Sequence, residues 1–145
     1  MQATFQAQPL VTEADRDNDI RSLRRCTQGF LYLSCRYGSG DDSRWEIPKT
    51  LVRDGETLRQ AAQRCLQEIA GDSVETFIFA NSPSDHTETA DDRTFYMLGV
   101  VLDGDVTLAS ESPAAEYAWL QRNELAEAYQ QDKDMSRIVH YLLEE

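Results

Sequence analysis

Residues 45–71 carry the strongest structural signals in the chain. Pro48 pushes the residue before it toward extended angles, and Asp54-Gly55 indicates a turn. Thr57 then stands at the expected N-cap of a helix, and Gly71 stands where that helix would end. Between them, apolar side chains recur at the three- and four-residue spacing of one buried helical face: Leu58, Ala61, Ala62, Cys65, Leu66 and Ile69. The stretch therefore predicts an extended segment, a turn and an amphipathic helix.

Length and composition indicate one globular α/β domain with a proper core, since the chain has 145 residues and is 41% hydrophobic. The formal charge of −12 argues against a large nucleic-acid surface, although a local RNA contact through arginines stays possible. Three cysteines without metal-ligand spacing indicate a reducing compartment and no disulfide framework. No apolar run approaches the roughly twenty residues that span a membrane, so we expect no membrane association.

The beginning of the chain is polar. Residues 1–15 contain no Lys or Arg, so we expect no signal peptide or basic transit peptide there. We interpret residues 1–25 as an extended arm followed by a short helical lead-in, and residues 26–145 as the domain. In residues 12–25 acidic side chains precede basic ones, which suits a helix dipole. This lead-in is either a solvated helix or a docking element that contacts a partner through Arg21, Arg24 and Arg25.

The remaining pattern predicts strands around the helix and helices after them. We expect strands at residues 29–37, 74–80, 94–102 and 117–120, with a short pairing segment at 106–108. Residues 94–102 are almost wholly apolar, which predicts a central strand covered on both faces. Turns are expected at residues 38–41 and 103–105, and a polar loop at 81–92. Asn123 is predicted to cap one helix, and a last amphipathic helix should contain Met135, Ile138, Val139, Leu142 and Leu143.

The central stretch resembles the Nudix box, in which a glycine, five residues, a glutamate and seven residues precede Arg-Glu-aliphatic-x-Glu-Glu-x-Gly. With the arginine of the motif placed on Arg64, the matching positions are Glu56, Leu66, Glu68 and Gly71. Trp45-x-x-Pro48 also resembles the usual lead-in. Three positions depart from the motif, since its glycine is Thr50, its first helix glutamate is Cys65 and its last is Ile69.

The departures bear on metal binding. Glutamates on one side of the Nudix helix hold magnesium against a diphosphate, and magnesium prefers carboxylate oxygens. Here one carboxylate, Glu68, stands beside the thiol of Cys65 and the alkyl group of Ile69, and a thiol is a soft ligand. The resemblance implies a Nudix-type α/β/α sandwich with a mixed sheet, of α/β (α+β) class. The departures from the motif predict that the chain has no catalytic, cofactor-binding or metal-binding residues.

The sequence also predicts the surroundings of individual side chains on and next to the helix. Cys65 is predicted to be a core thiol with a raised pKa. Arg64 and Glu68 stand four residues apart and should form an ion pair, and Glu56 should support the junction between loop and helix.

Joining the box to its flanks gives a closer resemblance, to the Nudix-fold proteins of the mitochondrial ribosome's large subunit, family forty-six. It covers nearly the whole chain from about Glu13. The residues that carry it are Glu13-Ala14-Asp15-Arg16, Ser22-Leu23-Arg24-Arg25, Gly55-Glu56-Thr57-Leu58-Arg59, Ala62-x-Arg64, Asn81-Ser82-Pro83, His86, Trp119 and Glu124-Leu125. The resemblance implies a non-catalytic structural component in the mitochondrial matrix, near the central protuberance, which contacts other mitochondrial large-subunit ribosomal proteins and at most limited rRNA.

Two other functions stay open. The first is a nucleoside diphosphate-derivative hydrolase that uses unusual ligands such as Glu56, Glu68 and Asp91. The second is a regulatory module that binds a nucleotide without cleaving it. Separately, Asp85-His86-x-Glu88 with Asp91 and Asp92 contains the ligand types of a divalent metal site, but the pattern favours a solvated acidic loop. His140 is predicted to be a packed or surface histidine instead of a general base.

Overall fold

The helix predicted at the centre of the chain is present as α2, Leu58–Ala70. Thr57 caps its start, because the Thr57 hydroxyl accepts from the Gln60 amide at 3.1 Å and the Thr57 amide donates to the Gln60 side chain at 2.9 Å. This exchange pairs two of the amides that a helix start leaves free. At the other end Gly71 has a φ of +60°, and its amide donates to the Gln67 carbonyl at 2.7 Å. Both predicted caps are confirmed.

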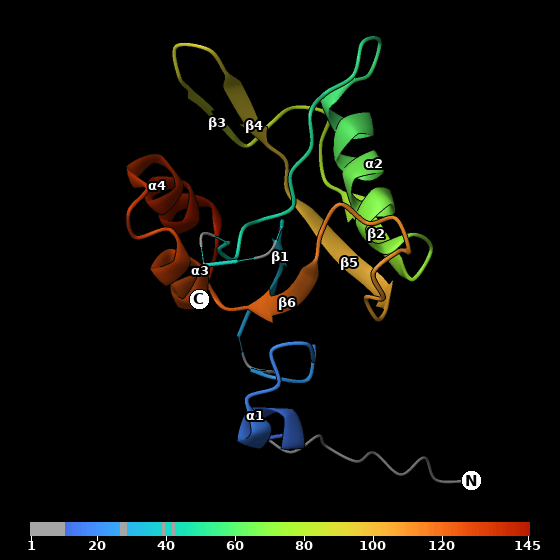
Figure 1. The fold of residues 1–145 in the computed structure, drawn as a ribbon, viewed down its shortest axis with the longest axis vertical. Helices are drawn as coiled ribbons and strands as arrows, with labels where there is room; N and C mark the ends of the chain where they lie inside the picture. Colours follow the sequence, from blue (N-terminus) through green and yellow to red (C-terminus); the bar gives the residue numbers. More distant parts are fainter. Residues whose placement is uncertain (1–10, 27–28, 39, 42) are drawn as a thin grey trace, which may run out of the picture.

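The computed structural model describes residues 11–145 apart from 27, 28, 39 and 42 (Figure 1). Most of the predicted arm falls on residues 1–10, and residue 39 of the predicted turn at 38–41 also lies outside the described residues. The described elements, in chain order, are α1 Glu13–Asp17, β1 Tyr32–Arg36, α2 Leu58–Ala70, β2 Val74–Ile78, β3 Asp85–Glu88, β4 Arg93–Tyr96, β5 Gly99–Gly104, β6 Glu116–Leu120, α3 Arg122–Ala128 and α4 Lys133–Leu142.

The strands pair two by two. β1 pairs with β6, β2 with β5 and β3 with β4, and each of these pairs is antiparallel. An isolated antiparallel bridge joins Cys35 on β1 to Glu46, which ties the beginning of the central stretch to β1. Among the described strands the arrangement is thus three antiparallel pairs, where a single mixed sheet was expected. Figure 1 shows α2 on one side of the molecule and α3 with α4 on the other.

The polar loop predicted at residues 81–92 is wrong, because β3 lies inside it. His86 and Glu88 are exposed while Asp85 and Thr87 are partly buried, so the side chains alternate as in a half-buried strand. A hydrogen bond of 3.1 Å joins the hydroxyls of Thr87 and Tyr96 across the hairpin. Because the alternating side chains are all polar, the pattern carried no hydrophobic signal for a strand.

The single central strand predicted at residues 94–102 is also wrong. It divides into β4 and β5, and Val100 and Leu102 on β5 are exposed on their outer side. Gly99 begins β5 where space is short, since a Cβ there would lie 2.8 Å from Ile78 Cδ1. A continuous apolar run does not distinguish a strand covered on both faces from one that leaves an apolar face open.

The C-terminal part differs only in detail. Residues 106–108, predicted to pair beyond the turn, form no strand, and Val106 is buried in the core instead. α3 begins two residues earlier than Asn123 predicts, with Gln121 as its N-cap, and the Gln121 amide donates to Glu124 Oε1 at 2.9 Å. The final helix is confirmed as α4, which ends at Leu142, so the predicted member Leu143 is its C-cap. None of the helices in the described part of the chain has the length and hydropathy that crossing a bilayer requires.

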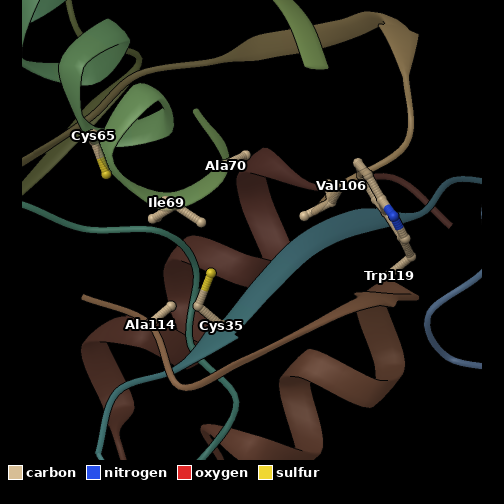
Figure 2. Close-up of a cluster of buried hydrophobic side chains, with 7 residues drawn as sticks. All are labelled: Cys35, Cys65, Ile69, Ala70, Val106, Ala114 and Trp119. Carbon is tan, nitrogen blue, oxygen red and sulfur yellow. The ribbon is translucent and has the colours of Figure 1, made fainter. Parts of the chain in front are cut away.

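The core has two clusters. The first joins α2 to the β1–β6 pair, and Figure 2 shows Cys65, Ile69 and Ala70 on the side of α2 that faces Cys35 of β1. The second lies between β6 and the last two helices and contains Leu120, Leu125, Tyr129 and Val139, among others. The first cluster fixes which face of α2 is inside, and therefore which face can carry chemistry.

Candidate functional site

Arg64, in the middle of α2, is the centre of the hydrogen-bonded group on the exposed side of the helix. Its Nε donates to Glu56 Oε2 at 2.7 Å, and its Nη2 donates to Glu56 Oε1 at 2.9 Å. The same guanidinium donates to the Thr50 hydroxyl at 3.1 Å and to the Leu51 carbonyl at 2.6 Å. A planar guanidinium fits this use because its donors point outward in a fixed fork. Arg64 therefore fastens the preceding loop to the helix.

Glu56 is held from both sides. The Arg64 guanidinium binds its two oxygens, and the Arg53 amide donates to Oε1 at 3.0 Å. The hydrogen bond from Arg64, followed by that from the Arg53 amide, lowers the pKa of Glu56 to about 2. The contact with Glu56 in turn raises the pKa of Arg64 above its ordinary value. Glu56 is thus a charged structural group at neutral pH, as its predicted place at the loop–helix junction suggested.

Glu68 is bound by two arginines. Arg64 Nη1 donates to Glu68 Oε1 at 3.1 Å, which confirms the predicted ion pair, and Arg53 Nη2 donates to the same oxygen at 3.1 Å. The Glu68 side chain is 35% exposed. Its negative charge therefore already faces two guanidinium groups where a Nudix helix would offer a carboxylate to a cation.

Cys65 and Ile69 lie on the opposite side of α2, in the core. Their exposed fractions are 6% and 0%, which confirms both as buried positions. Burial raises the pKa of the Cys65 thiol to about 11, so the predicted raised pKa is confirmed and the thiol is neutral at physiological pH. Neither side chain can reach the solvent side of the helix, where Glu68 and Arg64 meet.

The residues of this helix do not fit a magnesium site. Magnesium prefers several oxygen ligands in octahedral geometry, whereas the three positions at issue supply one carboxylate, one buried thiol and one alkyl group. Within residues 11–26, 29–38, 40–41 and 43–145, no group of three or more His, Cys, Asp or Glu side chains is placed to hold a metal ion. Of the Nudix-box positions, the structure brings Thr50, Glu56, Arg64 and Glu68 together, places Cys65 and Ile69 inside, and leaves Gly71 at the helix end.

The acidic residues of the β3–β4 hairpin form separate ion pairs. Asp85 binds Arg137 of α4 at 2.9 Å, and Glu88 binds Arg93 across the hairpin. The His86 amide and Arg137 both bond to the Asp85 carboxylate, which lowers the pKa of Asp85 below its ordinary value. Asp91 and Asp92 are exposed in the turn. His140 is exposed on α4, as predicted, with its ring 5.3 Å from that of Tyr141.

The three arginines of the lead-in have different surroundings. Arg25 is 4% exposed, and its Nη2 donates to Glu124 Oε1 at 2.8 Å and to the Trp119 carbonyl at 2.7 Å. Arg21 and Arg24 are exposed, although Arg21 also lies 3.7 Å from Glu116. Arg25 is therefore engaged inside the fold, and a partner could reach only Arg21 and Arg24.

Sequence reasoning predicted only the pair of Arg64 with Glu68. Three of the contacts that it missed are Arg64 with Glu56, Arg53 with Glu68, and Arg25 with Glu124. The first two cross the loop that precedes α2, and the third joins residues 99 positions apart. Helical spacing, which predicted the pair of Arg64 with Glu68, covers none of them.

Comparison with known proteins identifies the fold and a set of relatives. The model of the NUDIX domain family matches residues 20–142. The large ribosomal subunit protein mL46 of Mus musculus is 30% identical over 144 residues, which cover 92% of this chain and 50% of the mouse protein. The mL46 protein of Neurospora crassa is 26% identical, over 81% of this chain and 36% of its own length. The chain thus spans about half the length, or less, of these curated relatives.

A solved structure also resembles the chain. It comes from a structural study of MutT from Aliivibrio salmonicida and Vibrio cholerae, and it superposes with a TM-score of 0.51 over 75% of this chain and 84% of that one. The two sequences are 19% identical, so the likeness concerns the fold alone. The expected Nudix-type fold class is confirmed by this likeness together with the family match.

Proposed function

The chain belongs to the NUDIX domain family, and from that premise we propose that it is a non-catalytic structural component of the mitochondrial ribosome's large subunit. The observation that carries the proposal is the similarity to mL46 proteins, which extends over 92% of the chain in the mouse comparison. The proposal includes a location in the mitochondrial matrix and a place near the central protuberance. It also takes residues 26–145 as the Nudix-like domain and residues 1–25 as its arm and lead-in.

The non-catalytic half of the proposal rests on α2. Metal-assisted hydrolysis needs several oxygen ligands around the cation. At the three helix positions the degenerate box offers Glu68 alone, and that carboxylate is bound by Arg53 and Arg64. The same helix residues instead serve the fold: Cys65 and Ile69 fill the core, and Arg64 fastens the loop.

The structural half rests on charge as well as on similarity. A net charge of −12 opposes contact with a long run of phosphates, so the main partners are other mitochondrial large-subunit ribosomal proteins. Limited rRNA contact is left to the exposed Arg21 and Arg24, which lie on the lead-in segment next to α1.

Depletion of the chain from its own cells tests the structural role. We expect the mature large subunit to decrease relative to the small subunit in sucrose gradients of mitochondrial extract, and re-expression of the wild-type chain to restore it. An unchanged ratio after complete depletion would contradict the role.

An assay with magnesium and a panel of nucleoside diphosphate derivatives tests the absence of catalysis. We expect no turnover above that of the Glu68→Gln variant. Magnesium-dependent turnover that this substitution removes would favour the hydrolase alternative.

A further inference from the structure

The outer face of the β2–β5 pair carries five exposed apolar side chains, which we call the β2–β5 face: Phe77, Phe79, Leu98, Val100 and Leu102. Their exposed fractions are 45, 59, 36, 39 and 57%. An aromatic side chain carries about 200 Å² of surface, so the two phenylalanines alone expose about 200 Å² between them. With the three aliphatic side chains the face reaches the few hundred Å² that mark an interaction site on a folded protein.

The five side chains form one surface. Phe77 lies directly opposite Val100 in the antiparallel register, and the Phe79 amide donates to the Leu98 carbonyl at 3.0 Å. The rings of Phe77 and Phe79 are 6.0 Å apart. Side chains in alternate positions, Val74 and Val101, pack against the first core cluster on the other side. The pair therefore has one face inside and one apolar face outside.

The charges beside this face favour a cationic partner. Glu75 and Asp103 are opposite each other in the register, both are exposed, and neither forms an ion pair with another described residue. Two carboxylates in opposite positions repel each other, and a cation placed between them relieves that repulsion. Arg59 of α2 lies 5.5 Å from the centre of the Phe77 ring, so the face already accommodates a guanidinium against an aromatic surface.

The dimensions suit a single helix. Two strands about 5 Å apart, with their side chains, present a strip about 10 Å wide, which is the diameter of one helix. Five strand residues extend about 17 Å, the length of about eleven helical residues or three turns. A partner strand would instead add at an edge of the pair and leave the phenylalanine rings uncovered.

We propose that the β2–β5 face docks an amphipathic helix of a partner protein, with an apolar stripe on the five side chains and Lys or Arg beside Glu75 and Asp103. The proposal deepens the structural role and rests on it, because it names one of the surfaces through which the chain joins its neighbours. Nucleic acid is the wrong occupant, since its phosphates would meet two carboxylates and an apolar surface.

Photo-crosslinking in the chain's own cells tests the occupant. A benzophenone amino acid replaces Leu102 in the full chain, and a matched control carries it at Tyr141, which is 73% exposed on α4. We expect mass spectrometry to identify, at position 102 and not at 141, a protein segment with helical apolar spacing and a net positive charge. A crosslink to RNA, to a second copy of the chain, to its own N-terminal residues or to an acidic segment overturns the proposal, as does no crosslink at 102.

A charge variant tests whether Glu75 and Asp103 recognise a basic partner. In the Leu102 crosslinking background, Glu75→Lys with Asp103→Asn changes two negative charges into one positive charge, and we expect the crosslink yield to fall about tenfold. Both residues are exposed, so the melting temperature should stay close to that of the wild type. The control, Glu111→Lys, alters an exposed acidic residue that belongs neither to the face nor to the pair of Glu75 and Asp103, and it should keep the wild-type yield. An unchanged yield for the double variant overturns the proposal.

The identity of the crosslinked protein separates this inference from the proposed function. A basic helix of a large-subunit ribosomal protein supports both. A basic helix of a protein from outside the ribosome supports the docking face and contradicts the ribosomal role. Co-sedimentation with the large subunit, together with an RNA or acidic crosslink at 102, contradicts the docking face alone.

Discussion

Arg64 binds both oxygens of Glu56, at 2.7 and 2.9 Å, across the loop that precedes α2. The two residues are eight positions apart, so the pair closes the turn at Asp54-Gly55 onto the helix. The remaining donors of the guanidinium bind the Leu51 carbonyl, the Thr50 hydroxyl and Glu68. The charged side of α2 thus maintains the shape of the loop, while its apolar side forms the core.

Acid should remove the contribution of Glu56 to the free energy of unfolding. Its folded pKa of about 2 lies below the ordinary value of 4.5, so the ion pair stabilises the fold above pH 4.5 and loses this effect as the pH falls toward 2. We expect Glu56→Gln to lower the free energy of unfolding at pH 7, and the difference from wild type to close between pH 4.5 and 2. Urea unfolding at several pH values measures the difference, and a constant gap down to pH 2 would show that Glu56 does not titrate in this range.

Glutamate at the two buried positions should be costly. Cys65→Glu with Ile69→Glu restores the acidic residues of the Nudix box but places two charges in the core, and we expect a loss of several kcal/mol. The matched control, Gln63→Glu with Gln67→Glu, adds the same charge on exposed positions of the same helix and should change stability by less than about 1 kcal/mol. Thermal unfolding compares the two. Equal melting temperatures would mean that the register of α2 is wrong.

Alkali should act through the buried thiols. The pKa of Cys65 is raised to about 11 and that of Cys35 to about 12, against an ordinary value of 9.0, because burial penalises the thiolate. The unfolded chain therefore releases these protons first, and stability falls as the pH rises above 9. Cys65→Ala should make the decline between pH 9 and 11 shallower, by up to about 2 kcal/mol. Denaturant unfolding under reducing conditions measures the free energy of unfolding at each pH. Parallel plots of this free energy against pH for variant and wild type would contradict the prediction.

Arg25 should be a stability residue. Replacement by Met removes the guanidinium that donates to the Glu124 carboxylate and to the Trp119 carbonyl, and we expect a loss of about 3 kcal/mol, the usual cost of breaking a buried pair. Arg24→Met provides the control, because Arg24 is exposed and its loss should cost no more than about 0.5 kcal/mol. If chemical denaturation gives the two variants the same stability, Arg25 does not hold the lead-in to the domain.

The parts of the fold that local patterns determine could be predicted. α2 has a capping threonine, a six-residue apolar stripe and a terminal glycine, and its limits followed from them. β1 and β6 likewise followed from short apolar runs between turn residues. β3 could not be predicted, because the side chains that alternate along it are all polar. The exposure of β5 could not be predicted either, because an unbroken apolar run does not indicate which face of the strand is covered.

In the candidate site, too, only the features that follow from local sequence patterns could be predicted. Helical spacing predicted the contact of Arg64 with Glu68 and the burial of Cys65 and Ile69. The contact of Arg64 with Glu56 depends on how the loop returns to the helix, and the contact of Arg25 with Glu124 depends on how distant segments meet. Neither has a local signal in one sequence, so both required the three-dimensional arrangement.

Sedimentation of the native protein from mitochondrial extract of its own cells tests whether the chain is a component of the large ribosomal subunit. We expect the chain to comigrate with the large ribosomal subunit and to stay with it through a high-salt wash, with ribosomal proteins identified by mass spectrometry in the same fractions. A chain that sediments alone as a monomer would contradict the ribosomal role and leave the family match as a statement about fold.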